Sequence, residues 1–265
     1  MKTALRVARM ECMNTELQIA MPSPKFTLSL VSHGHAAMLP GLLEDIRKVM
    51  RLYGQEMFEL LLTFNIPEDD GFMDRFRDVP LTRIDNLCPA GFGANQNAAF
   101  KRANGQYFVI LNPDVSLSTV DFDALLAQFA YADVGAVAPK VIDSTGVLQD
   151  SARRFPTMLG LLKRVLTSRR ESDYPTVQEP SEVDWVAGMF VVFRREAWAS
   201  VSGFDERFFM YFEDVDLCRR MRRAGWRVIY QPVTSIVHDA QRASHRRADH
   251  LVWHLRSAIR YFLGI

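Results

Sequence analysis

The feature that most constrains the fold of this chain is an alternation of short apolar runs with amphipathic segments. The runs are rich in β-branched and aromatic residues, as buried strands are, and cover residues 26–32, 58–64, 81–86, 107–111 and 134–141. Apolar residues recur at helical spacing between them, over residues 39–50, 91–103 and 121–131. Strands that alternate with helices predict an α/β fold with a mostly parallel, Rossmann-like central sheet.

The second half of the chain has a looser pattern. A helix is expected over residues 159–167, and a polar loop follows over residues 168–181. Further on, the apolar run at 185–193 predicts one strand, residues 214–224 a helix, and residues 227–230 and 235–237 two short strands. We expect this half to form a C-terminal subregion beside the central sheet.

Composition narrows the class of protein. The chain has 265 residues, 48% of them hydrophobic, which is enough for one large domain with a core. Its net charge of +1 predicts no nucleic-acid partner. The three cysteines have neither disulfide-framework nor zinc-site spacing, which favours a cytoplasmic location. No apolar stretch reaches the ~20 residues that span a bilayer, and residues 1–24 are expected to be a flexible extension without signal-peptide character.

Two acidic signatures, about a hundred residues apart, point to chemistry. Asn112-Pro113-Asp114 follows the apolar run at 107–111, and Glu213-Asp214-Val215-Asp216 opens a predicted helix. A buried strand that ends in a carboxylate places negative charge at the sheet edge where open α/β folds bind ligands. A second carboxylate pair can hold a proton acceptor across the same cleft. Together they indicate a metal–nucleotide site that faces a general base.

The order of motifs resembles a known family. They are Gly91-Phe92-Gly93-Ala94-Asn95-Gln96-Asn97, Asn112-Pro113-Asp114, Asp184-Trp185-Val186-Ala187-Gly188, Gly203-Phe204-Asp205-Glu206, Phe212-Glu213-Asp214-Val215-Asp216-Leu217 and Val237-His238-Asp239. This order is similar to that of glycosyltransferase family 2, the inverting enzymes with the GT-A fold. It looks most like the rhamnosyltransferase-like bacterial members, which build cell-surface polysaccharide. The resemblance covers about residues 26–250 and implies a GT-A domain over residues 25–241.

The resemblance implies a divalent metal, Mg²⁺ or Mn²⁺, at Asp114. Asp114 stands where the family's Asp-x-Asp motif ends, but Asn112 replaces the first aspartate. Carboxylate and phosphate oxygens suit these hard cations, and His238 is the further ligand that related enzymes suggest. Two simpler interpretations stay open: Asn112 and Asp114 as ordinary turn residues, and His238 as a histidine held by a hydrogen bond.

The donor nucleotide, a dTDP- or UDP-sugar, is expected to lie along the same edge. By resemblance its pocket is formed by Ser32, His33, Asn65, Gly91, Gly93, Asn97, Asn112 and Asp114. Glycines let a backbone approach a ligand closely, although the same segment also suits a plain strand-to-helix turn. Phe64-Asn65 stands where many relatives carry Asp-Asn or Asp-Asp, and Asn65 offers a pyrimidine both a donor and an acceptor. The choice between thymine and uracil stays open.

The acceptor side carries the expected catalytic base. By resemblance Asp214 takes the proton of the acceptor hydroxyl and Glu213 orients the acceptor, whereas the simpler interpretation is that both carboxylates stabilise a helix N-terminus. Trp185, Ala187 and Gly188 fall on the family's acceptor-facing strand. An indole can stack on a sugar, but a tryptophan buried in the core is an equal alternative.

The last segment, residues 242–265, is predicted to hold a basic amphipathic helix. Its apolar face comprises Leu251, Leu255, Ile259 and Phe262. Arginines cluster in it and just before it, at Arg242, Arg246, Arg247, Arg256 and Arg260. Such a helix can lie on an anionic membrane surface, which would suit a lipid-linked acceptor, or it can pack on the domain.

The combined hypothesis is a metal-dependent inverting glycosyltransferase. It would move a sugar, rhamnose from dTDP-rhamnose in particular, to a saccharide or a polyprenyl-linked glycan in cell-surface polysaccharide synthesis, at the inner face of the cytoplasmic membrane. Two alternatives stay open. A non-catalytic nucleotide-sugar-binding subunit would explain the missing aspartate at Asn112, and a sugar-nucleotidyltransferase would share the scaffold. The second would need a basic residue in the loop at residues 32–35, which is Ser-His-Gly-His.

Overall fold

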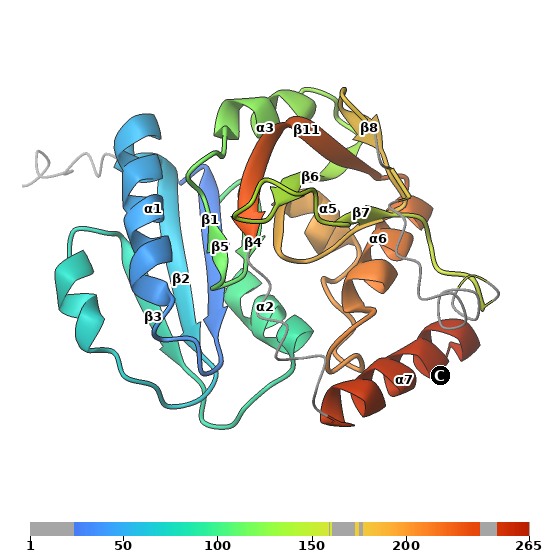
Figure 1. The fold of residues 1–265 in the computed structure, drawn as a ribbon, viewed down its shortest axis with the longest axis horizontal. Coiled ribbons are helices and arrows are strands. Elements are labelled where there is room, and N and C mark those ends of the chain that lie inside the picture. The colour runs from blue at the N-terminus through green and yellow to red at the C-terminus, as the bar shows by residue number, and fades with distance from the viewer. Residues whose placement is uncertain (1–23, 159, 161–172, 175–176, 239–247, 265) are drawn as a thin grey trace, which may run out of the picture.

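A curled sheet with helices on both faces organises the computed structural model (Figure 1), which describes residues 24–158, 160, 173–174, 177–238 and 248–264. The strand order is β3-β2-β1-β4-β10-β6-β11-β5, and β8 pairs with β11. The strands are β1 (Phe26–Ser32), β2 (Phe58–Phe64), β3 (Leu81–Asp85), β4 (Tyr107–Leu111), β5 (Val115–Ser116), β6 (Val134–Ile142), β8 (Ser181–Glu182), β10 (Phe190–Arg194) and β11 (Arg227–His238). The α/β fold predicted from the sequence is confirmed.

The helices lie largely where the sequence placed them. They are α1 (Leu39–Tyr53), α2 (Phe92–Phe100), α3 (Phe122–Gln128), α5 (Arg195–Ser200), α6 (Glu213–Arg223) and α7 (Ala248–Leu263), with short 3₁₀ helices at Gln55–Met57 and Gly71–Phe76. Helix α1 has a proline in its first turn and ends at Gly54, whose φ is 96°. In α3 the Asp121 side chain accepts hydrogen bonds from the amides of Asp123 and Ala124.

The first four strands of the sheet are parallel, and β10 then reverses direction. Strands β3, β2, β1 and β4 pair in parallel, whereas β10 runs antiparallel to both β4 and β6. Because of this reversal the start of β10, rather than its end, lies beside the carboxyl end of β4. The residues that enter β10 are therefore brought to the edge of the sheet where the parallel strands end.

Two strand predictions for the second half were wrong in detail. The run at 185–193 is not one strand, because the chain turns between β9 (Trp185–Val186) and β10, with the Met189 amide bonded to the Ala187 carbonyl at 2.9 Å. Strand β9 pairs with β7 (Ala152–Arg153) in a separate two-stranded sheet. The two short strands expected at 227–230 and 235–237 form one strand, β11, whose pairing with β6 shifts between Gln231 and Ser235.

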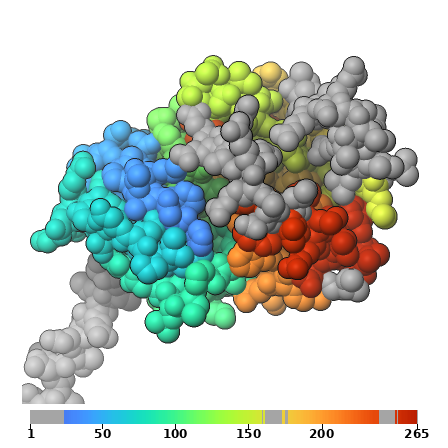
Figure 2. Space-filling view, turned by 60° about the horizontal axis from the view of Figure 1, so that its bottom comes forward, coloured from blue at the N-terminus to red at the C-terminus, as the bar shows by residue number. Residues whose placement is uncertain are grey.

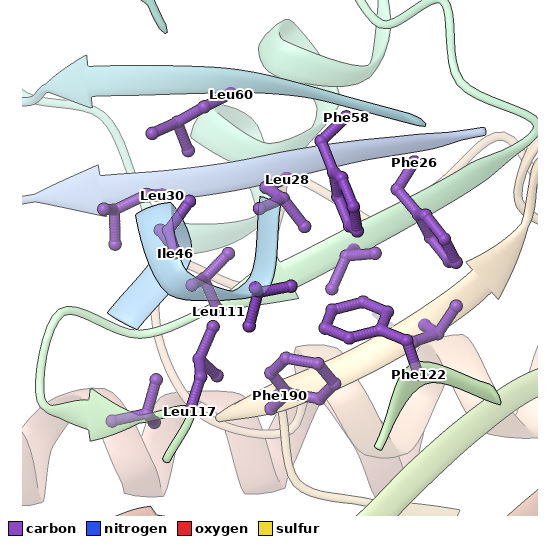
Figure 3. Close-up of a cluster of buried hydrophobic side chains, with 14 of the residues drawn as sticks. Phe26, Leu28, Leu30, Ile46, Phe58, Leu60, Leu111, Leu117, Phe122 and Phe190 are labelled. Atoms are coloured by element: carbon purple, nitrogen blue, oxygen red, sulfur yellow. The ribbon is translucent and has the colours of Figure 1, made fainter. Parts of the chain in front are cut away.

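Hydrophobic side chains fill both faces of the sheet. On one face, β1, β2, β4 and β10 pack against α1 and α3, as Figure 3 shows. Here Phe26 stacks on Phe58 at 5.1 Å and meets the edge of Phe122 at 5.0 Å between ring centroids. On the other face, which α2, α5 and α6 cover, Trp198 of α5 is 1% exposed and contacts Phe108, Phe193 and Phe204.

Some predictions fall outside the described residues. These are the extension at 1–24 except Pro24, nearly all of the helix expected at 159–167, and Arg242, Arg246 and Arg247. Within the described part of the chain, no helix is both long and apolar enough to cross a membrane.

Candidate active site

The two acidic signatures meet through the turn that enters β10. Leu111, the last residue of β4, pairs with Phe190, the first residue of β10. Beyond that pair, the Asn112 amide donates to the Met189 carbonyl at 2.9 Å. One residue earlier, the Gly188 amide donates to Oδ2 of Asp214 at 3.4 Å. The carboxyl end of β4 and the first turn of α6 are therefore attached to the same turn.

At the first side of this site, Asp114 is paired with His238. The two side chains approach to 3.2 Å between Oδ2 and Nε2, since β5 and β11 pair so that Val115 lies opposite His238. Burial raises the pKa of Asp114, but the hydrogen bond and charge of His238 outweigh it and lower that pKa overall. The other carboxylate oxygen, Oδ1, is buried and has no partner among the described residues.

A carboxylate with one unpartnered oxygen, next to an imidazole, fits a divalent cation. The described residues contain no cluster of three or more His, Cys, Asp or Glu side chains that could hold a metal ion. Asp114 and His238 could therefore supply only part of a coordination shell. The remaining positions suit the oxygens of a donor diphosphate or of water.

Helix α1 supports the Asp114 side of the site through Asp45, a residue that the sequence did not single out. Oδ2 of Asp45 accepts hydrogen bonds from Oγ of Ser116 at 2.6 Å and from the Leu117 amide at 3.1 Å. These bonds attach β5 to α1 and so place the chain that follows Asp114. A cavity of about 560 Å³ opens there, lined by α1, by β5 and by Asp114.

At the second side of the site, Glu213 and Asp214 form the first turn of α6. Oδ1 of Asp214 accepts from the Val215 amide at 2.8 Å. Burial raises the pKa of Asp214, against the lowering effect of backbone hydrogen bonds and Arg153. Glu213 is 7% exposed, and its Oε2 has no hydrogen-bond partner among the described residues. Burial, followed by the charge of Asp214, raises the pKa of Glu213 well above its usual value. Raised carboxyl pKa values suit proton transfer near neutral pH.

The backbone just before this pair is strained. Tyr211 and Phe212 have φ values of 70° and 65°, in the left-handed region that residues with a Cβ rarely adopt. Such conformations cost about 1–3 kcal/mol each and persist only where the surroundings impose them. Here α7 does so: the Tyr211 hydroxyl is hydrogen-bonded to Nδ1 of His250 at 2.7 Å, and the Phe212 ring packs against His254.

Asp216, further along α6, is paired with Arg219 and Arg220, which is a structural role.

The loop after β1 is held by a second residue that the sequence did not reveal, Glu68. Its carboxylate accepts hydrogen bonds from Oγ of Ser32 at 2.8 Å, the Gly34 amide at 2.9 Å and the Ala36 amide at 2.7 Å. Ser32 is fully buried, whereas His33 is exposed and His35 is partly exposed, so both histidines of this loop can reach a ligand.

Both the oxygen and the nitrogen of the Asn65 side-chain amide are hydrogen-bonded to neighbouring loops. Its Oδ1 accepts from the Ala90 amide and from Nδ2 of Asn86, both at 2.8 Å. Its Nδ2 lies 2.9 Å from the Ala90 carbonyl and from Nδ1 of His33. These partners support a role in orienting His33 and the segment before α2, rather than direct hydrogen bonds to a nucleobase.

The glycine segment packs closely against the loop that leads to α6. A Cβ at Gly91 would lie 2.8 Å from the Phe209 carbonyl oxygen, and a Cβ at Gly93 would lie 2.8 Å from Phe204. Asn97 accepts from the Phe204 amide and donates to its carbonyl, both at 2.9 Å. These three residues thus join α2 to the base-bearing loop.

Of the three expected acceptor residues, Gly188 lies nearest the chemistry because its amide contacts Asp214. The Ala187 amide donates to the Ser151 carbonyl at 2.8 Å. Trp185 is 7% exposed, and its indole nitrogen donates to the Arg154 carbonyl at 2.9 Å. The tryptophan ring is therefore part of the core beneath the site, with little surface left for a sugar.

Comparison with known proteins finds the same family that the order of motifs resembles. A family model described as "Glycosyltransferase like family 2" matches residues 61–256. An "N-acetylglucosaminyl-diphospho-decaprenol L-rhamnosyltransferase" of Mycobacterium tuberculosis is 32% identical over 221 residues, which is 71% of each chain. "Rhamnosyltransferase WbbL" of Escherichia coli is 29% identical over 251 residues, covering 88% of this chain and 90% of that protein.

Solved structures share the fold. The mannosyltransferase PcManGT from Pyrobaculum calidifontis, in complex with GDP-Man and Mn²⁺, superposes with a TM-score of 0.59 at 21% identity. That match covers 90% of this chain and 65% of the other, slightly less than two thirds of its length. S. aureus TarS 1–349 in complex with UDP-GlcNAc gives a TM-score of 0.58 at 14% identity, with 89% and 66% covered.

Proposed function

Because this chain belongs to glycosyltransferase family 2 and has the GT-A fold, we propose that it is a divalent-metal-dependent inverting enzyme that uses Asp214 as its base. The donor we propose is dTDP-rhamnose, and the acceptor is a glycan linked to a polyprenyl diphosphate. The names of the mycobacterial and enterobacterial relatives support both assignments.

The observation that carries the proposal is the contact between Gly188 and Asp214. It holds the base at the turn that is also bonded to the carboxyl end of β4, where Asp114 lies. Inversion requires the acceptor hydroxyl to attack the anomeric carbon opposite the departing diphosphate. Asp214 takes the hydroxyl proton as the new glycosidic bond forms, and the bond from the anomeric carbon to the diphosphate oxygen breaks. A divalent cation, when bound, neutralises charge on the diphosphate.

The remaining site residues have supporting roles. Asp114 and His238 would hold the metal, and Asn112 offers a neutral amide beside them. Exposed His33 would border the nucleobase, and its hydrogen bond to Asn65 supports that assignment. The unpartnered Oε2 of Glu213 is a buried acceptor atom that an incoming sugar hydroxyl can satisfy, which supports its role in orienting the acceptor.

Donor hydrolysis is the sharpest test of this function. The full-length protein is incubated with dTDP-rhamnose, UDP-N-acetylglucosamine or GDP-mannose, with Mn²⁺ or with a chelator, and release of nucleoside diphosphate is measured. We expect release from dTDP-rhamnose that needs the metal and is lost in Asp214→Asn. Equal release with the chelator would contradict the metal assignment, and preference for another donor would contradict the rhamnose assignment.

The neutral residue at Asn112 favours one competing function, a non-catalytic nucleotide-sugar-binding subunit. Calorimetry separates the two. Metal-dependent binding of dTDP, without hydrolysis or transfer under any condition, would favour the binding subunit. Family membership argues against the sugar-nucleotidyltransferase alternative.

A further inference from the structure

Helix α7 presents an apolar stripe to solvent. Its exposed apolar side chains are Val252, Leu255, Ile259 and Leu263, with exposed fractions of 46%, 59%, 44% and 66%. They are spaced by three or four residues and therefore share one face of the helix. The sequence had placed Phe262 on the face of Leu255 and Ile259. In the structure Phe262 instead packs toward Phe212 at 6.5 Å between ring centroids.

The opposite face of α7 is attached to the loop that carries the base. Ser257 and Tyr261 are buried, and Oγ of Ser257 donates to the Met210 carbonyl at 2.8 Å. In Figure 2 the helix, in red, lies on the molecular surface directly against the orange segment that contains this loop. The apolar stripe is thus held rigidly, on the outside of the acceptor side of the site.

Arginines border the stripe. Arg256 and Arg260 follow Leu255 and Ile259 in the sequence, so they lie along one edge of it. With Arg207, whose guanidinium group is paired with Asp205, they line a cavity of about 290 Å³ whose wall includes Trp253. Residues 250–265 contain no aspartate or glutamate. An aromatic ring and several guanidinium groups beside an apolar stripe match the boundary between lipid headgroups and acyl chains.

We propose that α7 docks this enzyme on an anionic phospholipid membrane, with its apolar stripe in the acyl boundary and the Arg207–Arg256–Arg260 cavity around headgroup phosphates. A second copy of the chain is a poorer occupant, because a twofold contact over this stripe would bring the arginines of both copies together. The inference rests on the proposed function in one respect: docking places the Asp214 side of the site toward an acceptor anchored in that membrane.

Vesicle flotation tests the docking. The full-length protein is mixed with vesicles of phosphatidylcholine alone or of phosphatidylcholine with phosphatidylglycerol, at low and high salt. We expect flotation with the anionic vesicles only, weakened by salt. The double variant Leu255→Gln/Ile259→Gln should reduce vesicle binding about tenfold or more. Arg256→Gln should weaken binding to anionic vesicles and reduce its salt dependence.

The matched control is Leu52→Gln, which replaces a 75% exposed leucine on α1. It should float like the unaltered chain. Absence of flotation, equal flotation with neutral vesicles, or equal loss in Leu52→Gln would overturn the proposal. The proposal would also be overturned if sedimentation showed that the unaltered chain and Leu52→Gln are dimers whereas the double variant is a monomer.

Metal-dependent donor hydrolysis without vesicles keeps the two proposals apart. The double variant should retain it, because Leu255 and Ile259 point to solvent. Intact flotation without any hydrolysis would reject the enzyme function and leave the docking surface standing. Hydrolysis without flotation would reject the docking surface and leave the enzyme function standing.

Discussion

Gly188 donates its backbone amide to Oδ2 of Asp214 at 3.4 Å, one residue before the carbonyl that binds Asn112. The proposed base and the strand end that precedes Asp114 are thus attached to the same short turn. A side chain at Gly188 would lie 3.5 Å from the Phe92 ring, so this turn also packs against α2. Displacement of the turn would alter donor and acceptor geometry together.

Replacement of Asp214 by asparagine should remove transfer and leave donor binding intact. The amide keeps the size of the side chain but cannot take a proton, so the rate should fall by roughly 10²–10⁴-fold. Transfer is followed with labelled donor, and nucleotide affinity by calorimetry. Asp123→Asn, an exposed change in α3, is the control. Near-normal turnover of Asp214→Asn would mean that another group is the base.

Replacement of Asn112 by aspartate should strengthen metal binding before the donor arrives. The change restores a second carboxylate beside Asp114, and cation affinity rises with the number of charged ligands. We expect Mn²⁺ affinity of the free protein to rise about tenfold, as measured by electron paramagnetic resonance titration. Ser118→Asp adds the same charge at an exposed position, and an equal gain there would show a general charge effect instead.

Stability should fall as the pH rises through the raised pKa of Glu213. The folded carboxyl holds its proton to a higher pH than the unfolded one, whose pKa is about 4.3. Its contribution to stability is therefore fully present below pH ~4.3 and is lost as the pH passes the folded value. Glu213→Gln should flatten this part of the pH profile and stabilise the protein at neutral pH, while acceptor use falls. Urea unfolding at a series of pH values measures the free energy of unfolding. An unchanged dependence of that free energy on pH in Glu213→Gln would contradict the raised pKa of Glu213.

Two glycines with positive φ should respond differently to alanine. Gly203 and Gly225 have φ values of 66° and 90°. A Cβ at Gly203 would lie 2.3 Å from Oδ1 of Asn97, whereas a Cβ at Gly225 meets nothing within 4 Å. Gly225→Ala should cost about 1–2 kcal/mol for the backbone alone, and Gly203→Ala roughly 1–3 kcal/mol more for the clash. The urea midpoints of the two variants measure these losses of stability. Equal losses would show that Asn97 can move away from the added methyl group.

Much of the fold was readable from local patterns. Strands Phe26–Ser32, Phe58–Phe64 and Tyr107–Leu111 match their predicted bounds, because each is a short, largely apolar run rich in aromatic and β-branched residues. The break between Trp185 and Phe190 was missed, since apolar residues continue through a turn whose conformation depends on its contacts. The order of strands across the sheet also depends on contacts between distant segments.

The sequence motifs pointed to the main candidate residues of the site, but not to the residues that hold them through long-range contacts. Asp114, His238 and Asp214 were singled out by position and resemblance. Glu68 and Asp45 were not, because each acts on a loop or strand more than 30 residues away, and no local pattern records that. The amides of Asn65 and Asn97 looked available for a ligand, whereas in the folded chain both are bonded to backbone groups.

The reversed direction of β10 divides the site between two lengths of chain. Asp114 and the loops proposed to border the nucleotide come from the parallel strands of the first 115 residues, whereas Gly188 and Asp214 come from the segment that enters and follows the antiparallel strand. Hydrogen bonds at the turn before Phe190 join the two halves. Under the roles proposed above, exchange of residues 150–214 between relatives should change acceptor preference and leave the use of the nucleotide as it is.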